Sequence, residues 1–229
     1  MGCSYRLSPI SKKLLKGGLH MQNTMEQITE SNELFTSMAK YSRLPLHTFE
    51  THRLWTFLPS KDTQDAYNMA LLFVGIKDGV PRRQHHFLTL AAESGRGKTH
   101  LAFGIGWHWL ELCMGVVLYY QVERLLTDMR AEFDQPARTG LKLIERCQRA
   151  GLLILDDLGA EKSGPWPIAK LDELVDHRYL NRLPTVFTTN SAPKQLPSRV
   201  ASRLKEGVTV LLEGPDYREL IARRRKGVT

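Results

Sequence analysis

The sequence is poor in cysteine and has no long uninterrupted apolar run. Its three cysteines, Cys3, Cys113 and Cys147, are far apart and form no CxxC pair, which favours a reducing compartment and argues against a structural zinc site. The most apolar stretch, residues 101–120, contains a histidine and a glutamate and is split by a glycine, so it does not suit a membrane span. The first residues lack the apolar core of a secretory signal. We therefore expect a cytoplasmic protein with no membrane contact.

Positive charge, by contrast, is in excess. The chain has 229 residues and carries 32 Lys and Arg against 24 Asp and Glu, a formal net charge of +8. An excess of this sign favours an anionic partner, such as nucleic acid or a phosphate-bearing ligand. Hydrophobic residues make up 42% and charged residues 24% of the chain, which excludes collagen-like and wholly disordered proteins. The length fits one domain with an appendage.

We place that appendage at the N-terminus. Residues 1–40 are expected to form a partly disordered extension, and residues 41–226 to form the folded domain. Residues 1–20 are basic and lack the periodicity of a helix or a strand, as is typical of disordered segments. The Lys-Gly-Gly tripeptide at 16–18 is what a ribosome-binding sequence would encode if it were translated. We therefore expect residues 1–20 to be upstream sequence read as protein, and Met21 to be the natural start.

A glycine-rich loop between an expected strand and an expected helix carries the strongest chemical signal. The apolar run 86–91 suits a buried strand, and residues 100–114 have the composition of a helix. Glycines let backbone N–H groups curl around phosphate oxygens, and the start of a helix attracts anions. Lys98 would place its charge on the β- and γ-phosphates, and Thr99 would offer its hydroxyl to Mg²⁺. The candidate nucleotide-binding residues are Glu93, Ser94, Gly95, Arg96, Gly97, Lys98, Thr99 and His100.

The loop departs at one position from the phosphate-loop pattern G-x-x-x-x-G-K-[ST]. Ala92 stands where that pattern has its first glycine. An alanine fits such a turn only if its φ angle is negative, so the departure bears on nucleotide affinity. The alternative interpretation of the segment is a glycine-rich turn that arose by chance and binds nothing.

A second apolar strand ends in two acids. Residues 152–155 are all apolar, which is typical of a central parallel strand buried on both faces, and Asp156 and Asp157 follow. Open α/β sheets bind ligands at the carboxyl ends of their strands. Asp156 is therefore a candidate Mg²⁺ ligand, and Asp157 a candidate for orienting an attacking water. Asn190 follows the run 185–189 and could hydrogen-bond the γ-phosphate or that water, although such an asparagine is more often a turn residue.

The motifs, in this order, resemble those of the DnaC/DnaI-type replicative helicase loaders, which are AAA+ ATPases. The transposition helper IstB shares their core. The residues that carry the resemblance are 95–102, 153–162, 184–190, 202–204 and 216–218. The resemblance implies an α/β fold, an AAA+ P-loop three-layer αβα sandwich with a parallel central sheet. We expect no C-terminal helical lid.

The spacing of the apolar runs agrees with that fold. Strands are expected at 86–91, 116–121, 151–156 and 184–190, with a late strand at 208–212, and they alternate with helix-like segments. Such alternation favours a parallel sheet with helices on both faces. An amphipathic helix at 62–78 is expected to precede the first strand and to pack on it.

The resemblance also assigns roles to individual residues. It implies that Lys98 and Thr99 hold ATP and Mg²⁺, that Asp156 and Asp157 are the Walker B acids, that Asn190 is sensor 1, that Arg203 is an arginine finger and that Arg218 is a sensor 2 arginine. Arg199 is a second candidate for the finger. Because a finger reaches into the ATP site of a neighbouring subunit, it implies a homo-oligomer.

Three residues fall where this family touches single-stranded DNA. Phe133 ends an expected helix at 122–133 and could equally belong to the core. Trp166 is flanked by glycine and proline, so we expect it on an exposed loop, with Lys162 nearby to serve a phosphate. Stacking of a base on such a ring tolerates any sequence and contributes about 1–3 kcal/mol.

Three functions are compatible with the sequence. The first is an ATP-dependent loader that places a hexameric replicative helicase on single-stranded DNA and hydrolyses ATP at subunit interfaces, with stimulation by DNA. The second is an IstB-like transposition helper, which would bind duplex DNA and a transposase. The third is a nucleotide-gated adaptor with little turnover, which the alanine at position 92 and the short N-terminal segment favour.

Overall fold

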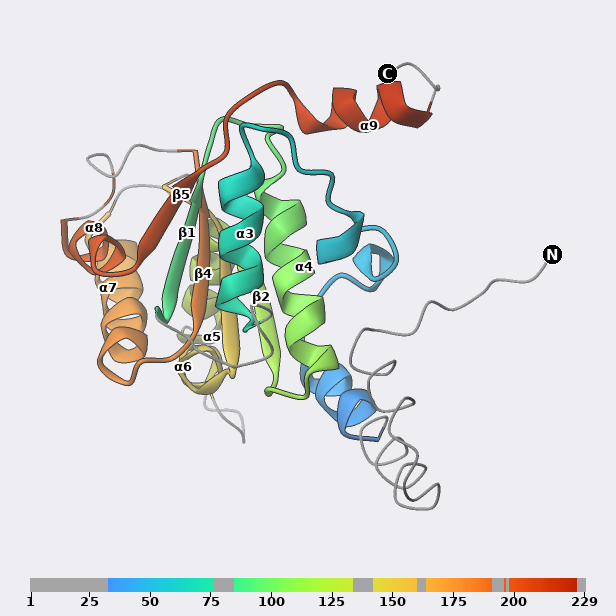
Figure 1. Ribbon diagram of the computed structural model, residues 1–229. Coiled ribbons are helices and arrows are strands. Elements are labelled where there is room, and N and C mark those ends of the chain that lie inside the picture. The colour runs from blue at the N-terminus through green and yellow to red at the C-terminus, as the bar shows by residue number, and fades with distance from the viewer. Residues whose placement is uncertain are drawn as a thin grey trace.

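The computed structural model describes residues 33–75, 85–133, 142–159, 164–190, 196 and 198–225. Its centre is a five-stranded sheet with helices on both faces (Figure 1). The strands are β1 (Phe87–Ala91), β2 (Val117–Gln121), β3 (Leu152–Leu158), β4 (Thr185–Thr189) and β5 (Val208–Leu211). The helices are η1 (Leu46–Thr48), η2 (Leu54–Thr56), α3 (Gln64–Phe73), α4 (Lys98–Glu111), α5 (Val122–Phe133), α6 (Leu143–Arg149), α7 (Pro165–Leu180), α8 (Ser198–Lys205) and α9 (Tyr217–Arg225).

The strands are all parallel, in the order β2-β3-β4-β1-β5. The predicted strands are confirmed with small shifts at their ends, except that β3 continues through both acids to Leu158. The order places β4 between β1 and β3. The glycine-rich loop follows β1, the acid pair lies near the carboxyl end of β3, and Asn190 follows β4. The topology therefore brings the three motifs to one edge of the sheet.

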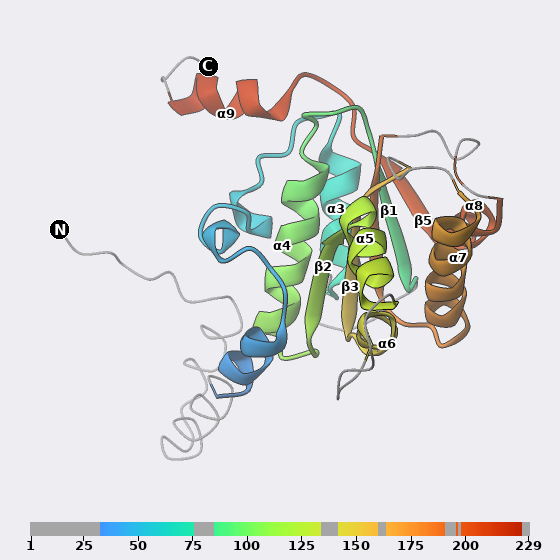
Figure 2. The same cartoon turned by 180° about the vertical axis from the view of Figure 1, so that it is seen from behind.

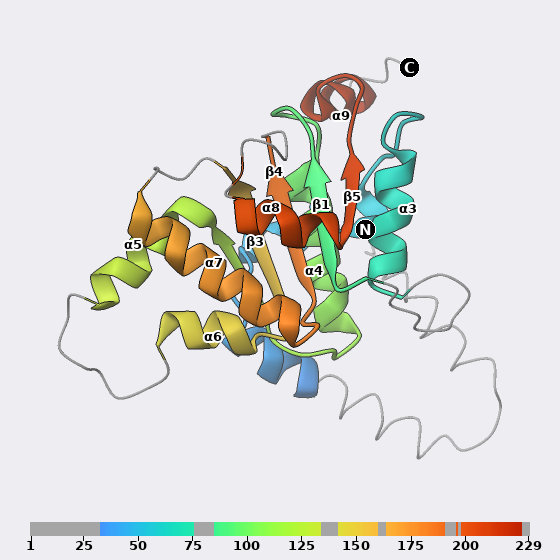
Figure 3. The ribbon, with the colours of Figure 1, turned by 90° about the vertical axis from the view of Figure 1, so that its left-hand side faces the viewer.

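Apolar side chains alternate between the two faces of the sheet and create two separate cores. On β3, Leu152 and Ile154 pack with α3 and α4 on one face, whereas Leu153 and Leu155 pack with α5 to α8 on the other. Figure 3 shows α5, α6, α7 and α8 grouped on one side of the strands, with α3 on the opposite side. This arrangement confirms the predicted three-layer αβα sandwich.

One core contains a buried arginine. Arg178 of α7 has no exposed side-chain surface, and no carboxylate among the described residues forms a salt bridge with it. Burial lowers the pKa of its guanidinium. Its donors instead bind oxygens at the end of α6 and the start of β4, namely the carbonyls of Cys147, Gln148, Ala150 and Pro184 and the hydroxyl of Thr185. Arg178 therefore ties α6, α7 and β4 together, and its charge complements the C-terminal end of α6.

The segment before the first strand packs on the body of the protein. Residues 33–41 are helical, and Phe35 and Met38 lie against the core on the α4 side. The domain boundary predicted at residue 41 thus falls at the end of a helix that contacts the core. Arg43 then forms a parallel bridge with Leu118 and continues the sheet beyond β2.

One helix differs from the sequence prediction. The helix expected at 62–78 is shorter, as α3 ends at Phe73, and residues 76–84 lie outside the described ranges. After β5 the described residues contain one further helix, α9, which extends away from the body (Figures 1 and 2). No helix in the described ranges has the length and apolarity that crossing a bilayer requires.

Candidate nucleotide-binding site

The loop between β1 and α4 has the backbone of an anion-binding turn. Gly95 and Gly97 adopt positive φ angles of 81° and 92°, a region that L-residues with side chains rarely enter. A Cβ atom on Gly95 would lie 2.3 Å from a carboxylate oxygen of Asp216, so any larger residue there would also have to displace that side chain. Ala92 is not among the residues with positive φ. The alanine that departs from the phosphate-loop pattern is therefore free of backbone strain.

Lys98 opens α4 and folds back over this loop. Its side chain is buried, and Nζ donates hydrogen bonds to the carbonyl oxygens of Ala92 (2.9 Å) and Glu93 (2.8 Å) and to Oδ1 of Asn190 (2.6 Å). Burial lowers the pKa of the ammonium group, and the charges of Asp156 and Asp157 oppose that shift. A phosphate oxygen offers such an ammonium a stronger acceptor than a carbonyl, so the lysine is placed to exchange these contacts for a bound triphosphate.

Asp156 lies beside the phosphate loop, buried among hydroxyl groups. Its Oδ1 accepts a hydrogen bond from Thr99 Oγ1 at 3.1 Å and another from the hydroxyl of Thr188. Its Oδ2 accepts from the hydroxyl of Tyr119 at 2.8 Å, and burial together with this carboxylate raises the pKa of the tyrosine. Three hydroxyls thus fix the orientation of one carboxylate.

Asp157 adopts an unusual backbone conformation. Its φ angle is +60°, and the pairing of β3 with β4 is irregular between Leu155 and Leu158. The Thr188 hydroxyl accepts the Asp157 N–H at 2.9 Å, and Asn190 Nδ2 donates to Asp157 Oδ1 at 2.8 Å. Left-handed backbone at a non-glycine residue costs free energy and is concentrated at functional sites. Here the bulge turns the second acid toward Asn190 while the first stays beside Thr99.

The contacts link all five predicted motif residues into one cluster. Lys98 binds Asn190, Asn190 binds Asp157, and Thr99 binds Asp156. Thr188 joins the two sets, since its hydroxyl accepts the Asp157 N–H and donates to Asp156. The oxygen donors of Thr99 and Asp156 are of the hard type that Mg²⁺ prefers, and Mg²⁺ sites commonly combine one or two carboxylates with substrate phosphates. The residues present therefore fit a magnesium–triphosphate complex. The sequence did not reveal Tyr119 and Thr188, because each lies inside a strand that reads as apolar and β-branched.

The side chain of His100 points away from the phosphate loop, so only its backbone is left for the predicted role in nucleotide binding. It is buried against the rings of His52, Phe57 and Tyr217, with ring centroids 4.7–5.4 Å apart, and it lies 3.3 Å from the carbonyl oxygen of Arg53. Burial lowers its pKa to about 4. Its position in the first turn of α4 directs the imidazole away from the loop and into the packing between α4 and the N-terminal segment.

Two of the remaining loop side chains bind each other. Arg96 forms an ion pair with Glu93 at 2.9 Å, and Ser94 lies exposed in the turn between these two residues. Arg218, the predicted sensor 2 residue, is exposed, and its backbone N–H donates to Asp216 at 2.8 Å. The preceding residue, Tyr217, donates its own N–H to the carbonyl of Gly95 at 2.8 Å, so the start of α9 is attached to the phosphate loop even though no contact of the Arg218 side chain with that loop is present.

Comparison with known proteins agrees with this geometry. Residues 25–198 match the family described as IstB-like ATP binding protein, which is well over half of the chain. The chain belongs to this family. The phosphate loop, the acid pair and Asn190 all lie within the matched residues, and the family predicted from the order of the motifs is confirmed.

Relatives of this IstB-like protein include replication proteins. The replicative helicase loader DnaC of Buchnera aphidicola is 26% identical over 138 residues, which cover 57% of this chain and 56% of DnaC. The chromosomal replication initiator DnaA of Onion yellows phytoplasma is 27% identical over 135 residues, 57% of this chain and 26% of DnaA. The matched regions thus span about half of the first relative and about a quarter of the second.

Solved structures confirm the predicted fold. A crystal structure of the DnaC helicase loader superposes with a TM-score of 0.63 at 22% identity and covers 72% of this chain and 98% of that one. A crystal structure of DnaI gives 0.60 at 23% identity, with 76% and 94% covered. AMPPCP-bound DnaA from Aquifex aeolicus gives 0.65 at 17% identity, with 77% and 55% covered.

The predicted arginine finger lies apart from the cluster in this IstB-like chain. Arg203 of α8 forms ion pairs with Asp176 at 2.8 Å and with Glu206 at 3.4 Å, and its guanidinium lies 4.4 Å from the ring centroid of Tyr179. Arg199, the second candidate, is exposed at the start of α8. A finger acts on a neighbouring subunit, so Arg203 would have to exchange these contacts within its own chain for a phosphate on another.

The predicted DNA contacts are only partly described. Trp166 was expected on an exposed loop, and this is wrong: it occupies the first turn of α7 and packs, half-buried, against the core beneath that helix. Proline favours the first helical position, and Pro165 starts the helix earlier than expected. Phe133 ends α5 as predicted, whereas its side chain and Lys162 lie outside the described parts of the structure.

Proposed function

We propose that this protein is an ATP-dependent loader of a hexameric replicative helicase onto single-stranded DNA. The observation that carries the proposal is the chain of contacts from Lys98 through Asn190 to Asp157. A relative named as the replicative helicase loader DnaC supports this role over other uses of an ATP-binding core. Binding of ATP would favour the assembled state that grips DNA, and hydrolysis would release the helicase.

The cluster supplies groups for both nucleotide binding and hydrolysis. Lys98 would bind the β- and γ-phosphates, and Thr99 and Asp156 would hold Mg²⁺, which withdraws charge from the phosphates when bound. Asp157 has one oxygen bound to Asn190, which leaves the other free to orient a water molecule. Asn190 contacts both the lysine and the acid, so it would sense the γ-phosphate and adjust the acid that acts on the water.

We further propose that Arg203 acts in trans, within a homo-oligomer. Arg203→Ala is expected to lose turnover, because an arginine finger neutralises charge that develops on the transferred phosphate. Mixing Arg203→Ala with Lys98→Ala subunits should restore part of the ATPase rate, because one kind of mixed interface combines an intact phosphate loop with an intact finger. A mixture as inactive as either variant alone would contradict action in trans.

A second function is favoured by one observation, the match to the IstB-like family itself. A transposition helper of that kind would bind duplex DNA and a transposase instead of a helicase. The two roles share the ATP site and differ in the partner, so the partner decides between them.

Affinity capture with the full chain tests the proposed function. With ATP and Mg²⁺ present, we expect the protein to retain a hexameric replicative helicase from its own host and to increase the amount of that helicase bound to single-stranded DNA. Lys98→Ala should abolish the increase. Recovery of a transposase without a helicase would favour the second function, and partner binding without any measurable ATP turnover would favour a nucleotide-gated adaptor.

A further inference from the structure

A second feature suited to an anionic ligand lies at the opposite end of the sheet from the phosphate loop. It is a pocket of about 220 Å³. Val116 and Ala150, which line it, stand one and two residues before β2 and β3, so the pocket lies at the amino ends of these strands, whereas the nucleotide cluster lies at the carboxyl ends of the sheet. The complete lining consists of Tyr41, Val116, Leu118, Arg146, Arg149 and Ala150. We call the pocket and the cations around it the basic groove.

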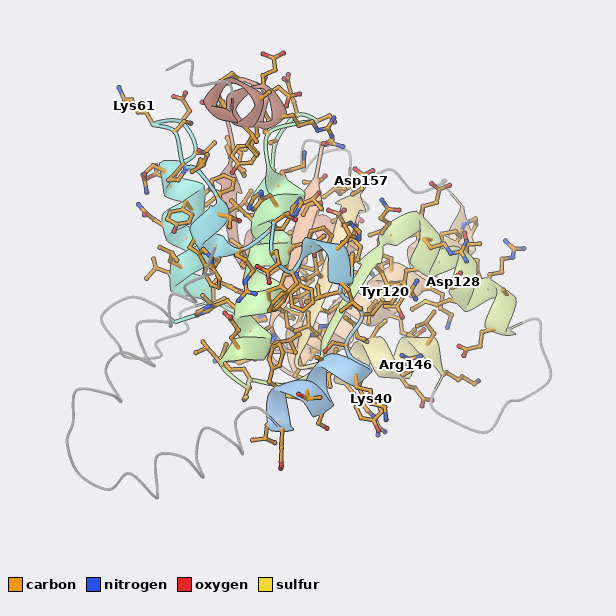
Figure 4. All side chains as sticks on the ribbon, turned by 90° about the vertical axis from the view of Figure 1, so that its right-hand side faces the viewer. Lys40, Lys61, Tyr120, Asp128, Arg146 and Asp157 are labelled. Atoms are coloured by element: carbon orange, nitrogen blue, oxygen red, sulfur yellow. The ribbon has the colours of Figure 1, made fainter. Side chains whose placement is uncertain are left out.

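Two of the residues that line the pocket, Arg146 and Arg149, are exposed cations three residues apart on one face of α6. Lys142, also exposed, is the N-cap residue of that helix. Lys40 and Arg43, which stand on either side of Tyr41 in the sequence, are exposed on the segment that borders β2. Figure 4 looks onto this side of the molecule, with Lys40 and Arg146 labelled.

These five cations have no acidic partner among the described residues. None of them takes part in a salt bridge there. Two carboxylates lie on the neighbouring helices: Glu132, whose Oε2 accepts the backbone N–H of Leu143 at 2.7 Å, and Glu145, which is half-buried on α6. Neither forms a salt bridge with a described cation. Neighbouring like charges repel one another, and a bound polyanion would remove that cost.

An aromatic ring stands beside the cations. Tyr41 is 65% exposed although it borders the pocket. Arg43 places its guanidinium 4.2 Å from the ring centroid of Tyr120, which holds that cation at the edge of β2. Sequence-tolerant binding of single strands combines a cationic track for the backbone with a ring on which bases stack. An acidic peptide would satisfy the charges but has no flat base for Tyr41, and in duplex DNA the base faces are covered.

We propose that the basic groove binds single-stranded DNA, with Arg146 and Arg149 on the phosphates and Tyr41 stacked on a base. The groove includes none of the three residues that were predicted to touch DNA, Phe133, Lys162 and Trp166. Because the groove shares no residue with the nucleotide cluster, it binds DNA without ATP. Its presence does not depend on which partner protein the ATPase serves.

A charge-reversal experiment tests the phosphate contacts. The probe is fluorescein-labelled oligo-dT, and the readout is fluorescence anisotropy over a series of salt concentrations without nucleotide. Arg146→Glu/Arg149→Glu should weaken binding at low salt at least tenfold. It should also reduce the slope of log K against log salt by about 1.4, since each phosphate contact on a single strand contributes about 0.7. The control Lys61→Glu/Lys205→Glu makes the same change in net charge at exposed positions elsewhere.

A second pair of variants tests the stacking. Tyr41→Ala should weaken binding of oligo-dT about 5- to 100-fold and leave the salt slope unchanged, and Tyr41→Phe should bind as the wild type does.

Two outcomes would overturn the site. If the Lys61→Glu/Lys205→Glu control loses as much affinity as Arg146→Glu/Arg149→Glu, the loss is a general effect of net charge. Loss of poly-glutamate binding with unchanged oligo-dT binding would assign the groove to an acidic protein segment instead. Lys98→Ala should bind oligo-dT as the wild type does, because the assay contains no nucleotide. A failure of the proposed ATPase function would therefore not change this result, and the two proposals can fail separately.

Discussion

Replacing Arg178 with alanine is expected to lower the free energy of unfolding by about 3–5 kcal/mol, at the upper end of the range for single substitutions, because it breaks a buried hydrogen-bond network. The variant would leave the carbonyl oxygens of Cys147 and Ala150 at the end of α6 buried without their donor, whereas the carbonyl of Pro184 would keep the N–H of Leu153. Each buried acceptor without a partner costs about 1–3 kcal/mol. Denaturant titration followed by circular dichroism measures the change.

Two further variants separate the causes of that loss. Arg178→Lys keeps a positive charge but cannot reach all of the acceptors at once, so it should recover only part of the stability. Arg124→Ala removes an arginine that is 68% exposed and paired with Asp128, and it should change stability by less than about 1 kcal/mol. An Arg178→Ala protein as stable as the Arg124 control would show that the buried hydrogen bonds do not hold α6, α7 and β4 together.

Replacing Asp157 with asparagine is expected to reduce the rate of ATP hydrolysis by about 10²- to 10⁴-fold, the contribution typical of a positioned acid or base. Nucleotide binding should persist, because Lys98, Thr99 and Asp156 are unchanged and Asp156 keeps its three hydroxyl donors. The amide can still accept from Asn190, so the bulge in β3 should survive. Release of phosphate and binding of a fluorescent ATP analogue are to be measured on the same preparation.

The matched control for this variant is Asp128→Asn. It makes the same chemical change on α5, where the acid pairs with Arg124 at 2.8 Å, and Figure 4 shows Asp128 well separated from Asp157. Its turnover should equal that of the wild type. Normal hydrolysis by Asp157→Asn would remove this carboxylate from the reaction and leave Asn190 or another group to orient the water.

The arrangement of the site could be predicted because it follows from strand order. Apolar runs of strand length define β1, β3 and β4, and parallel strands present their carboxyl ends at one edge. The positions of Lys98, Asp157 and Asn190 at those ends were therefore enough to predict that they meet, and their contacts of 2.6 and 2.8 Å agree. The central strands themselves could be predicted because a strand that is buried on both faces of a sheet has a continuous apolar sequence.

Other features depend on contacts that a linear pattern does not contain. Arg178 reads as an ordinary helix cation, and only the folded chain shows that it is buried. His100 follows directly after the phosphate loop, yet the turn of α4 directs it into a cluster of rings. Trp166 was placed on a loop because proline and glycine precede it, whereas Pro165 in the first helical turn is compatible with a helix.

Isothermal titration calorimetry with ATP tests most directly whether the cluster at the carboxyl edge of the sheet holds a triphosphate with Mg²⁺. We expect saturable binding of one ATP per chain in the presence of Mg²⁺, weaker binding when EDTA removes the metal, and at least a 100-fold loss of affinity in Lys98→Ala, which lacks the ammonium group that faces the loop. Heats no larger than those of dilution for the wild-type protein at millimolar ATP and Mg²⁺ would contradict the assignment of this site.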